Sequence, residues 1–581
     1  MTATKKKLNF AGDVVSSLSG FINRVVLGTR RTALLNVLFV AAFTSLKVVA
    51  IIGLVSISAI AEKTISDGAE SKLPRGQTRP NIILLLTDDQ RADTLSIEGH
   101  SRVRTPNIDD LARSGVRFKN AFTVQPICAA SRFAFFSGQY ERTSGLGFNS
   151  PYEVNAAQWS NTYPALLREA GYYSGFIGKY GVQYYNLGRG IETQFDYWRG
   201  HDGWLPFFPK DLPENPSTAI YQSSKHDIVT EIMGELIADF LDRRPRHQPF
   251  LLSVSFSAPH NSIVSTMHPE GASPDCNSYA CRVMGYPSNS NPRLRGHPIY
   301  DELYRQPPPE PSADTGRDPF RFIPEGVIDH EARMKWYAYN YETTLQPEHL
   351  VRYYQTVSGI DKVIGDLRAL LGAEGLEDNT VIIFSSDHGL LNGEYGTGGK
   401  ALLYDLVAKI PLIIYDPRAA FADAGSTNKE LVLNIDVPAT IIALAGLETP
   451  NTMEGRSLLA QETPRQEVFL ESLTVAEGNP FIEATRTQHW KYVRYFAARA
   501  CPYREDDLDF TKSEPIFEQL FDLRNDPEER RNLASSSDHQ NVLAHLQKRT
   551  SQHSQYRTNA GRRYKLATPV SHRPEDGVYC W

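Results

Sequence analysis

The sequence has few cysteines, little excess charge of either sign and no internal repeat. Its 581 residues include five cysteines and carry a formal net charge of −6. Outside the N-terminus there is no long basic stripe, so the composition gives no support to nucleic-acid binding. With 41% hydrophobic and 22% charged residues the composition is that of an ordinary globular protein, and the length allows more than one structural unit.

The small number of cysteines leaves one of them without an obvious partner. Cys276 and Cys281 are close enough in sequence for a small loop disulfide, and Cys501 and Cys580 could then close a C-terminal loop. The sequence does not prove this connectivity, and free thiols are the alternative. An oxidising compartment would favour the disulfides. Cys128 then remains unpaired.

Long hydrophobic runs are scarce, and the longest lies in the basic N-terminal segment at residues 32–61, interrupted by Lys47. Residues 48–57 fit the apolar region of a signal peptide, and residues 59–61 supply an A-x-A cleavage site. We expect cleavage there, with an uncleaved membrane anchor as the alternative. Both interpretations predict an exported chain. If the segment is cleaved, the protein is periplasmic, secreted or lumenal; if it is not cleaved, the N-terminus holds the protein at the membrane.

Continuous apolar runs bounded by turn residues recur along the chain, separated by segments with helical spacing. Such runs are typical of strands buried on both faces of a parallel sheet. The alternation predicts an α/β fold with a mostly parallel central sheet flanked by helices. The predicted strands are 81–87, 116–124, 172–177, 249–256, 380–386 and 410–415. The predicted helices are 106–114, 162–170, 228–242, 349–371 and 437–444, with a further helix beginning near 128.

The pattern divides the chain after its first 61 residues into three further parts. Residues 62–79 are polar and rich in turn residues, and we expect a linker. Residues 80–456 form the predicted catalytic domain, with a long loop-rich insertion at about 261–344. Strands become shorter and more alternating after that, as at residues 490–495, which predicts a smaller α+β subdomain and tail at 457–581.

Cys128 is predicted to lie at the start of a helix, just before the apolar run at residues 133–136. A thiol there feels the positive end of the helix dipole, and Arg132 one turn later adds a full positive charge. The stretch therefore suits an anion. A lone cysteine before an apolar run is more often structural, so this stretch alone does not establish a function.

Carboxylates follow two separate predicted strands. Asp88 and Asp89 come directly after one of them, and Asp387 and His388 after another. Ligands of α/β folds gather beyond the carboxyl ends of the strands, and a divalent cation there would relieve the repulsion between the carboxylates. Oxygen ligands suit Ca²⁺ or Mg²⁺, while the histidine would permit a transition metal. A single Asp-Asp pair is more often a turn or helix cap, but two clusters together with Cys128 indicate a metal site.

With these motifs the chain resembles a type I sulfatase of the alkaline phosphatase-like superfamily. The family signature is C-x-P/A-x-R, whose cysteine is oxidised to Cα-formylglycine, and residues 128–132 read Cys-Ala-Ala-Ser-Arg. The resemblance covers roughly residues 80–533. Its other motifs, all in the family's order, are Asp88-Asp89, Thr105-Pro106-Asn107, Ser137-Gly138-Gln139-Tyr140, Gly178-Lys179, Ala258-Pro259-His260, Asp387-His388-Gly389, Lys400, Gln519-Leu520-Phe521-Asp522-Leu523 and Asp526-Pro527.

The resemblance implies a mechanism in which residue 128 is a hydrated formylglycine. One hydroxyl attacks sulfur and the substrate alcohol leaves, giving a covalent sulfate ester, and collapse of the diol to the aldehyde then expels sulfate. The resemblance also implies the roles of the site residues. The metal, Ca²⁺ or Mg²⁺, would be held by Asp88, Asp89, Asp387, His388 and residue 128. Arg132 would stabilise the diol. Lys179 and Lys400 would contact sulfate oxygens, and His260 would protonate the leaving oxygen or bind sulfate.

One position departs from the family pattern. Many members have a histidine two residues after the lysine of the Gly-Lys segment, where this chain has Gly181. Gln183 or a residue from another loop could substitute for it. The Gly-Lys-Tyr sequence resembles glucosamine-6-sulfatases and extracellular heparan sulfatases, whereas Asp387-His388 resembles iduronate- and choline-type sulfatases, so the substrate stays open. The aromatic residues near Gly200-His201-Asp202-Gly203 could stack on sugar rings or pack internally; they are Trp198, Trp204, Phe207 and Phe208.

The sequence therefore predicts a metal-dependent sulfatase acting on a sulfated carbohydrate or polysaccharide. Its implied partners are that substrate and a formylglycine-generating or sulfatase-maturating enzyme. A phosphonate or phosphodiester hydrolase of the same superfamily is one alternative. A catalytically silent carbohydrate-binding relative, in which Cys128 stays a thiol, is the other.

Overall fold

The computed structural model describes most of the chain between residues 79 and 569. None of the described helices is both long and apolar enough to cross a bilayer. The N-terminal segment, most of the linker, the other four cysteines, Gln183 and Trp204 lie outside the described residues, so the predictions made for them stay predictions. Within 79–569 the gaps are 149–151, 183–189, 202, 204, 212–217, 266, 268–297, 319, 329–345, 419–424, 460–462, 474–479, 498–507 and 565–567.

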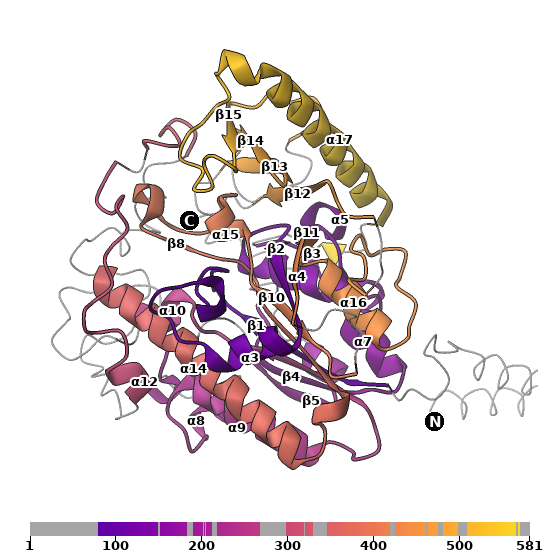
Figure 1. Ribbon diagram of the computed structural model, residues 1–581. Coiled ribbons are helices and arrows are strands. Elements are labelled where there is room, and N and C mark those ends of the chain that lie inside the picture. Colours follow the sequence, from indigo (N-terminus) through magenta and orange to yellow (C-terminus); the bar gives the residue numbers. More distant parts are fainter. Residues whose placement is uncertain are drawn as a thin grey trace, which may run out of the picture. The chain divides into compact units, whose positions relative to one another are not determined.

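An eight-stranded sheet occupies the centre of the main unit (Figure 1). Its strand order is β11-β2-β10-β7-β1-β6-β4-β5, and β10 alone among these strands runs antiparallel to its neighbours. The predicted α/β fold with a mostly parallel sheet is thus confirmed. The strands are β1 (Asn81–Thr87), β2 (Val116–Phe122), β4 (Tyr173–Lys179), β5 (Tyr197–His201), β6 (Phe250–Ser255), β7 (Thr380–Ser386), β10 (Leu412–Tyr415) and β11 (Thr427–Leu433).

Both faces of this sheet are covered by helices, which explains its continuous apolar strands. In β1, Ile83 and Leu85 join one hydrophobic cluster, whereas Ile82 and Leu84 join another on the opposite face. Alternate residues of a strand point to opposite faces, so a strand covered on both sides must be apolar throughout. One face carries α3 (Pro106–Ser114), α9 (Val229–Arg243) and α14 (Gln346–Ala373); the other carries α4 (Cys128–Ser137), α7 (Tyr163–Glu169) and α16 (Asp436–Leu444) (Figure 1).

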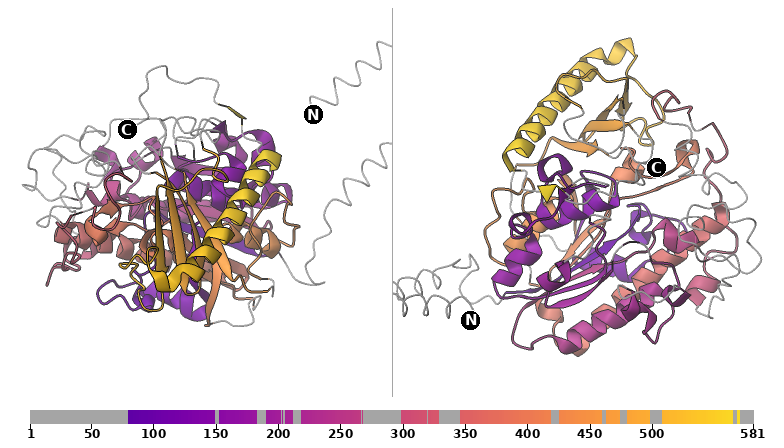
Figure 2. Two further views of the ribbon diagram at one scale, coloured as in Figure 1. Left: turned by 90° about the horizontal axis from the view of Figure 1, so that it is seen from above. Right: turned by 180° about the vertical axis from the view of Figure 1, so that it is seen from behind.

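A second, antiparallel sheet follows the first in the chain. Its strands are β12 (Glu467–Ser472), β13 (Phe481–Thr487), β14 (Trp490–Phe496) and β15 (Phe517–Asp522), in that order. The helix α17 (Gln540–Tyr564) lies across this sheet (Figure 2). A smaller C-terminal α+β unit was predicted and is present; the exact residue at which it begins stays a prediction.

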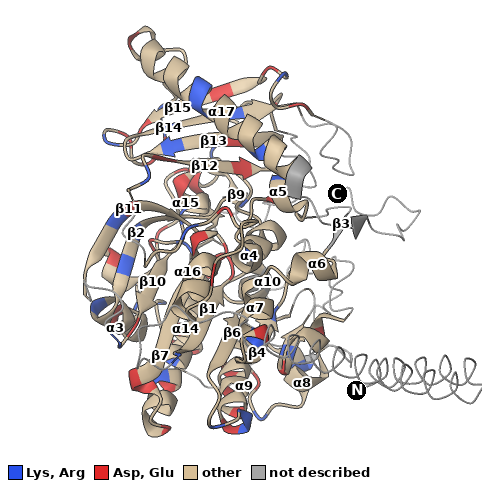
Figure 3. Ribbon diagram, turned by 90° about the vertical axis from the view of Figure 1, so that its right-hand side faces the viewer, with Lys and Arg blue, Asp and Glu red and all other residues tan. Residues whose placement is uncertain are grey.

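The remaining described elements are short. Charged residues of both signs are interspersed over the described elements, without a stripe of one sign (Figure 3). The short helices are η1 (Ser96–Glu98), α5 (Glu141–Ser144), α6 (Ala156–Trp159), η2 (Ile191–Gln194), η3 (Pro209–Asp211), α8 (Ala219–Gln222), α10 (Asn261–Ser265), α12 (Pro298–Asp301), η4 (Glu377–Asn379), η5 (Glu394–Gly396), α15 (Asp405–Ala408) and η7 (Ser537–His539). The short strands are β3 (Tyr152–Glu153), β8 (Leu391–Asn392), β9 (Gly398–Gly399) and β16 (Thr568–Pro569).

The suggested sugar-stacking platform is wrong for Phe207 and Phe208, and Trp198 packs partly against the core. Phe207 and Phe208 are 0% and 4% exposed and belong to the core. Trp198 stacks on Phe176 with ring centroids 5.1 Å apart. These rings pack internally because burial of a large aromatic surface is more favourable than its exposure.

Candidate active site

Two neighbouring strands bring the two acidic clusters to one edge of the central sheet. The strands β1 and β7 pair in parallel, with Thr87 opposite Ser386, so Asp88-Asp89 and Asp387-His388 leave the sheet side by side. The Asp387 amide donates to the Thr87 carbonyl over 3.0 Å, and the Asp89 amide donates to Asp387 Oδ1 over 3.1 Å. Asp89 has a φ of +65°, a left-handed conformation that turns the chain here. The sequence predicted this convergence from the strand ends alone.

Cys128 is the first residue of α4, as predicted, and it is 4% exposed. Its Sγ lies 3.6 Å from Asp88 Oδ1 and 2.9 Å from Lys400 Nζ. The helix is fixed to the acidic edge because Ser131 Oγ donates to the Asp387 carbonyl over 2.5 Å. The side chain at 128 therefore lies between a carboxylate and an ammonium group.

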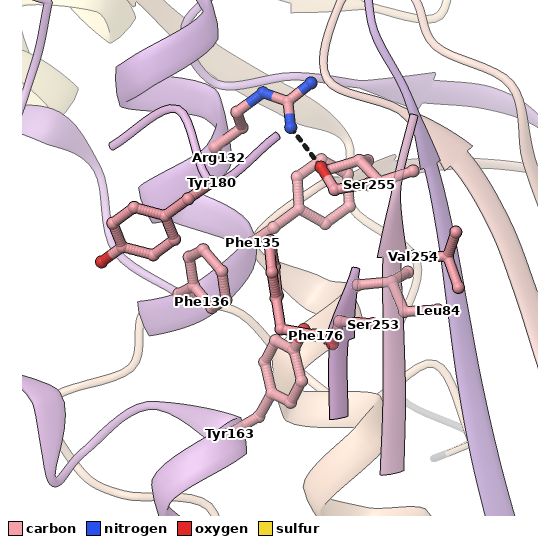
Figure 4. A pocket seen from close by; sticks show the side chains of 11 residues that line it. Leu84, Arg132, Phe135, Phe136, Tyr163, Phe176, Tyr180, Ser253, Val254 and Ser255 are labelled. Atoms are coloured by element: carbon pink, nitrogen blue, oxygen red, sulfur yellow. Dashed lines mark hydrogen bonds between the residues drawn. The ribbon is translucent and has the colours of Figure 1, made fainter. Parts of the chain in front are cut away.

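Arg132 connects the two acidic clusters, because it contacts both Asp88 and Asp387. The guanidinium is 1% exposed; its Nε donates to Asp387 Oδ2 over 3.0 Å and its Nη2 lies 3.1 Å from Asp88 Oδ2. Its Nη1 donates to the Lys179 carbonyl over 2.9 Å and to Ser255 Oγ (Figure 4). The pKa of Arg132 is raised, because the attraction of the two carboxylates outweighs burial. Arg132 is thus placed to hold both carboxylates in position.

A small cavity of about 10 Å³ lies beside this guanidinium. Aromatic rings surround it, among them Phe136, Phe176 and Tyr180 (Figure 4). Tight packing of these rings leaves the arginine little room to move. The geometry of Arg132 is therefore set by packing as well as by charge.

Lys179, Lys400 and His260 complete the cluster. Lys179 ends β4, and its Nζ lies 2.5 Å from Asp88 Oδ2. Lys400 Nζ donates to Asp89 Oδ1 over 2.9 Å and lies 3.3 Å from His260 Nε2. At 8% and 6%, Lys400 and His260 are the most exposed of the nine predicted site residues. All nine are brought together by the structure: Asp88, Asp89, Cys128, Arg132, Lys179, His260, Asp387, His388 and Lys400.

The electrostatic environment divides the carboxylates into two kinds. Burial acts to raise the pKa of Asp88, but Lys179 and Arg132 outweigh it and hold that pKa well below its usual range. Burial also acts to raise the pKa of Asp89, but Lys400 outweighs it and lowers that pKa. Burial and the charge of Asp88 raise the pKa of Asp387 instead. Asp88 and Asp89 are therefore held as anions by the surrounding cations.

The histidines differ in the same way. Burial lowers the pKa of His260 well below its usual value, so this ring is held neutral. Burial also acts to lower the pKa of His388, but the adjacent Asp387 outweighs it and raises that pKa to about 9. Lys400 has a pKa well above its usual value, because Asp89 and Cys128 outweigh burial. A neutral His260 thus lies beside a firmly cationic Lys400.

The donor atoms of this cluster fit a divalent cation. Oxygen, nitrogen and sulfur donors lie within 4.8 Å of one another in two overlapping sets, one from Asp88, Asp89, Cys128 and His260 and the other from Asp88, Cys128, Asp387 and His388. Asp89 Oδ2 is buried and makes no hydrogen bond with any described residue. A buried carboxylate oxygen without a partner is costly, and a cation would satisfy it.

The backbone at Gly181 leaves no room for a side chain. The residue has a φ of +63°, and a Cβ there would approach Arg132 Cδ to 2.8 Å and Lys179 Cε to 3.2 Å. A side chain at 181 would be strained and would press on the arginine that holds both carboxylates. The suggested substitute Gln183 lies outside the described residues.

Several residues that support the site were not predicted. Tyr353 of α14 donates its hydroxyl to the Asp89 carbonyl over 2.7 Å and accepts the Arg91 amide over 3.0 Å. His201, opposite Lys179 in the β4–β5 pair, has its Nε2 3.2 Å from Ser257 Oγ, next to the turn that carries His260. These contacts join residues far apart in the chain, and no local pattern indicates them. The sequence analysis named the Gly200-His201 segment only for its aromatic neighbours and predicted no strand there.

Comparison with known proteins decides the family. A sulfatase family model matches residues 80–447, which is more than half of the chain and includes all nine site residues. The chain belongs to the sulfatase family. A second model, described as the C-terminal region of N-sulphoglucosamine sulphohydrolase, matches residues 393–556 of this sulfatase. The chain is thus a type I sulfatase of the alkaline phosphatase-like superfamily, as the sequence motifs predicted, and hence a sulfuric ester hydrolase.

Among its curated relatives is the N-acetylglucosamine-6-O-sulfatase of Bacteroides thetaiotaomicron. The two are 27% identical over 413 residues, covering 65% of this chain and 70% of the relative. A solved structure of a protein in complex with its substrate D-glucosamine-2-N,6-O-disulfate has the same fold, with a TM-score of 0.59 and 23% identity, covering 83% of this chain and 99% of that one. A phosphonate monoester hydrolase of Agrobacterium radiobacter also shares the fold, with a TM-score of 0.57 and 20% identity, covering 85% and 100%.

Proposed function

We propose that this sulfatase hydrolyses sulfate esters of a sulfated carbohydrate, with residue 128 as the nucleophile after conversion of its thiol to formylglycine. The observation that carries the proposal is the position of Cys128 Sγ, 3.6 Å from Asp88 Oδ1 and 2.9 Å from Lys400 Nζ. A nucleophile between an anionic metal ligand and a cation is suited to attack an anionic ester.

A divalent cation would be held by Asp88, Asp89, Asp387, His388 and residue 128. We propose Ca²⁺ for this ion, with Mg²⁺ as the alternative. When bound, that ion would supply charge stabilisation for the sulfate group and for the nucleophile. The first step of the proposal is the recognition of an anionic group by the cationic side chains of the site, Lys179 and Lys400.

The chain's own residues would then divide the work. Lys400 and Lys179 would contact sulfate oxygens, on which negative charge is spread as the ester bond breaks. His260, whose ring is neutral before substrate binds, would bind sulfate, or would protonate the leaving oxygen after it has taken up a proton. Its contact with Lys400, 3.3 Å between Nε2 and Nζ, keeps the two groups on the same side of the site. Arg132, which contacts both Asp88 and Asp387, would hold the carboxylates and the group at 128 in register.

The substrate class is proposed from the relatives and from the reaction centre. The N-acetylglucosamine-6-O-sulfatase and the structure with a disulfated glucosamine both concern sulfated amino sugars. We therefore propose a sulfated carbohydrate or polysaccharide as the substrate of this chain. The buried position of the site favours attack at a sulfate group that protrudes from the sugar.

A phosphonate or phosphodiester hydrolase is the second candidate, because the Agrobacterium enzyme has a similar fold. The experiment that separates the two compares the turnover of an aryl sulfate, an aryl phosphonate monoester and an aryl phosphodiester by the matured protein. We expect the highest kcat/KM for the aryl sulfate. A higher kcat/KM for either phosphorus ester would overturn the proposal. The Cys128→Ala variant should be inactive toward all three, which controls for contaminating hydrolases.

We further propose that the protein is exported and matured by a formylglycine-generating or sulfatase-maturating enzyme. The support for export is the basic and apolar N-terminal segment that ends at Ala61. Edman sequencing of the protein recovered outside the cytoplasm should begin at Glu62 if the segment is cleaved. A full-length chain recovered from the membrane fraction would instead indicate an anchor.

A further inference from the structure

The Asp526-Pro527 motif belongs to a tightly held turn after β15, which the proposed mechanism does not use. The Asp526 carboxylate accepts the Arg530 amide over 3.0 Å at one oxygen and the Arg531 amide over 2.7 Å at the other. The Glu529 amide donates to the Asp526 carbonyl over 3.1 Å, and Glu529 has a φ of +53°, which is uncommon for a residue with a side chain. The motif therefore holds Glu529 in one defined conformation.

This turn contacts both ends of the segment 395–405, which carries Lys400 at its middle and which we call the Lys400 loop. At the N-terminal end, Tyr395 donates its hydroxyl to the Glu528 carbonyl over 2.8 Å. At the C-terminal end, the Asp405 amide donates to Glu529 Oε2 over 2.6 Å. Two adjacent residues of the turn thus hold the two ends of the loop.

The Lys400 loop is closed at its base and attached at its tip. The rings of Tyr395 and Tyr404 stack at the base, with centroids 4.0 Å apart and planes at 11°. At the tip, the Ala401 amide donates to the Pro126 carbonyl over 3.0 Å. Lys400 precedes Ala401, and its Nζ lies 2.9 Å from the sulfur at 128. Because a lysine side chain is flexible, the place of its ammonium group depends on how the backbone of the loop is held.

Buried charges fix the base of the loop to the second sheet. Asp405, the first residue of α15, pairs with Lys491 over 2.9 Å and with Arg486 over 3.0 Å. Lys491 pairs in turn with Glu529 Oε1 over 2.6 Å. The side chains of Lys491 and Glu529 are 0% and 1% exposed. Removal of one member of a buried ionic network leaves the others unbalanced, so the loss of Glu529 should disturb the base of the loop.

We propose that Glu529 is a positioning residue for Lys400: by holding the base of the Lys400 loop, it sets where the ammonium group lies relative to residue 128. Glu529 acts through the Asp405 amide. The inference rests on the proposed function, in which Lys400 contacts a sulfate oxygen. It gives the turn after β15 a part in sulfate recognition, although none of the nine site residues belongs to that turn.

Substitution of Glu529 in the matured enzyme tests this role. Glu529→Ala removes the acceptor of the Asp405 amide, so kcat/KM for an aryl sulfate should fall about 10-fold, and the inhibition constant of sodium sulfate should rise. Tyr395→Phe loosens the other end of the loop by one hydroxyl and keeps the ring, so kcat/KM should fall about 3-fold. This milder variant provides the same test if Glu529→Ala does not fold.

A double-mutant cycle with Lys400→Ala separates positioning from a general loss of structure. If Glu529 acts through Lys400, then Glu529→Ala or Tyr395→Phe should change the remaining kcat/KM of Lys400→Ala by less than about 2-fold. A general loosening of the fold would instead lower kcat/KM by the same factor with and without Lys400. That result would overturn the proposal, and so would an unchanged kcat/KM when Glu529→Ala is made with Lys400 present.

The matched control is Glu528→Ala, which removes the neighbouring carboxylate. That side chain is 70% exposed and pairs with Arg530 over 2.7 Å, and the variant keeps the carbonyl that accepts the Tyr395 hydroxyl. Its kcat/KM should stay within about 2-fold of the parent, because exposed ion pairs contribute little. A loss equal to that of Glu529→Ala would overturn the proposal.

The same measurements separate this inference from the proposed function. Absence of aryl sulfate turnover in the matured parent would count against the proposed function itself. An active parent that loses turnover in Lys400→Ala but not in Glu529→Ala or Tyr395→Phe would overturn only the positioning role. Full turnover by Lys400→Ala would overturn both the sulfate contact of Lys400 and the positioning role.

Discussion

Gly181 has a φ of +63° and lies against the side chain of Arg132. Because Arg132 contacts both Asp88 and Asp387, a small displacement of its guanidinium moves two candidate metal ligands together. The residue that differs from the family pattern is thus coupled to the acidic cluster through one side chain. The sequence could identify the difference, but only the structure shows that a Cβ at 181 would approach Arg132 Cδ to 2.8 Å.

Substitution of Gly181 tests this coupling. Gly181→Ala and Gly181→His should each lower kcat for an aryl sulfate by about 10-fold or more, since small errors in position are costly at a reaction centre. Gly190→Ala is the matched control: Gly190 has a φ of +84° but nothing within 4 Å of its added Cβ, so it introduces backbone strain without the contact. A rise in kcat for Gly181→His would contradict this explanation.

At the scale of elements, sequence patterns predicted what is local. The buried strands β1, β6 and β7 were correctly located because an apolar run bounded by polar residues needs no partner to be recognised. The edge strands β5 and β11 were not, since their residues are only partly apolar. The antiparallel direction of β10 was also not predicted, because a strand's direction in a sheet depends on its connections.

The helix α14 was predicted, but its contact with the acidic loop was not. Tyr353→Phe removes the hydroxyl that contacts the Asp89 carbonyl and the Arg91 amide. We expect the Ca²⁺ concentration for half-maximal activity to rise about 10-fold, since partners of the ligands tune metal affinity. The neighbouring Tyr354→Phe is the control, because the Tyr354 ring packs against His100 and its hydroxyl makes no hydrogen bond with any residue that the structure describes. Equal effects of the two substitutions would reject this role.

The contact between α17 and the second sheet predicts a pH dependence of stability. Glu467 of β12 contacts His553 and Arg549 of α17; burial acts to raise its pKa, but these partners outweigh burial and lower the pKa to about 2, from a usual value of 4.5. A depressed pKa in the folded state stabilises the protein above pH 4.5, and the contribution is lost as the pH falls toward 2.

Glu467→Gln should therefore lower the free energy of unfolding by about 1 kcal/mol at pH 7, a modest value because Arg549 and His553 are partly exposed and solvent screens their charges. Urea unfolding at pH 7 and pH 3 measures the difference between variant and parent, which should shrink at the lower pH. Glu518→Gln is unsuitable as a control because it also contacts α17, so Glu430→Gln on the edge strand β11 is used. A difference that grows on acidification would contradict the assignment.

At the scale of the whole molecule, the family fold, the nine site residues and their grouping were predictable, because the motifs lie at strand ends and helix starts. The support around them was not, because Ser255, Tyr353 and His201 join the site only through long-range packing. The second sheet is joined to the catalytic part by buried charge as well: Arg142 of α5 pairs with Glu471 and Glu483 of β12 and β13.

The central claim is that the working group at 128 is an aldehyde made from the cysteine. Its most direct test is the mass of the tryptic peptide 120–132, from protein produced together with a formylglycine-generating enzyme. The peptide should be about 18 Da lighter than its unmodified form, since oxygen replaces the elements of hydrogen sulfide. The converted fraction should rise in parallel with aryl sulfate turnover. An unmodified thiol in a preparation that is fully active would contradict the account.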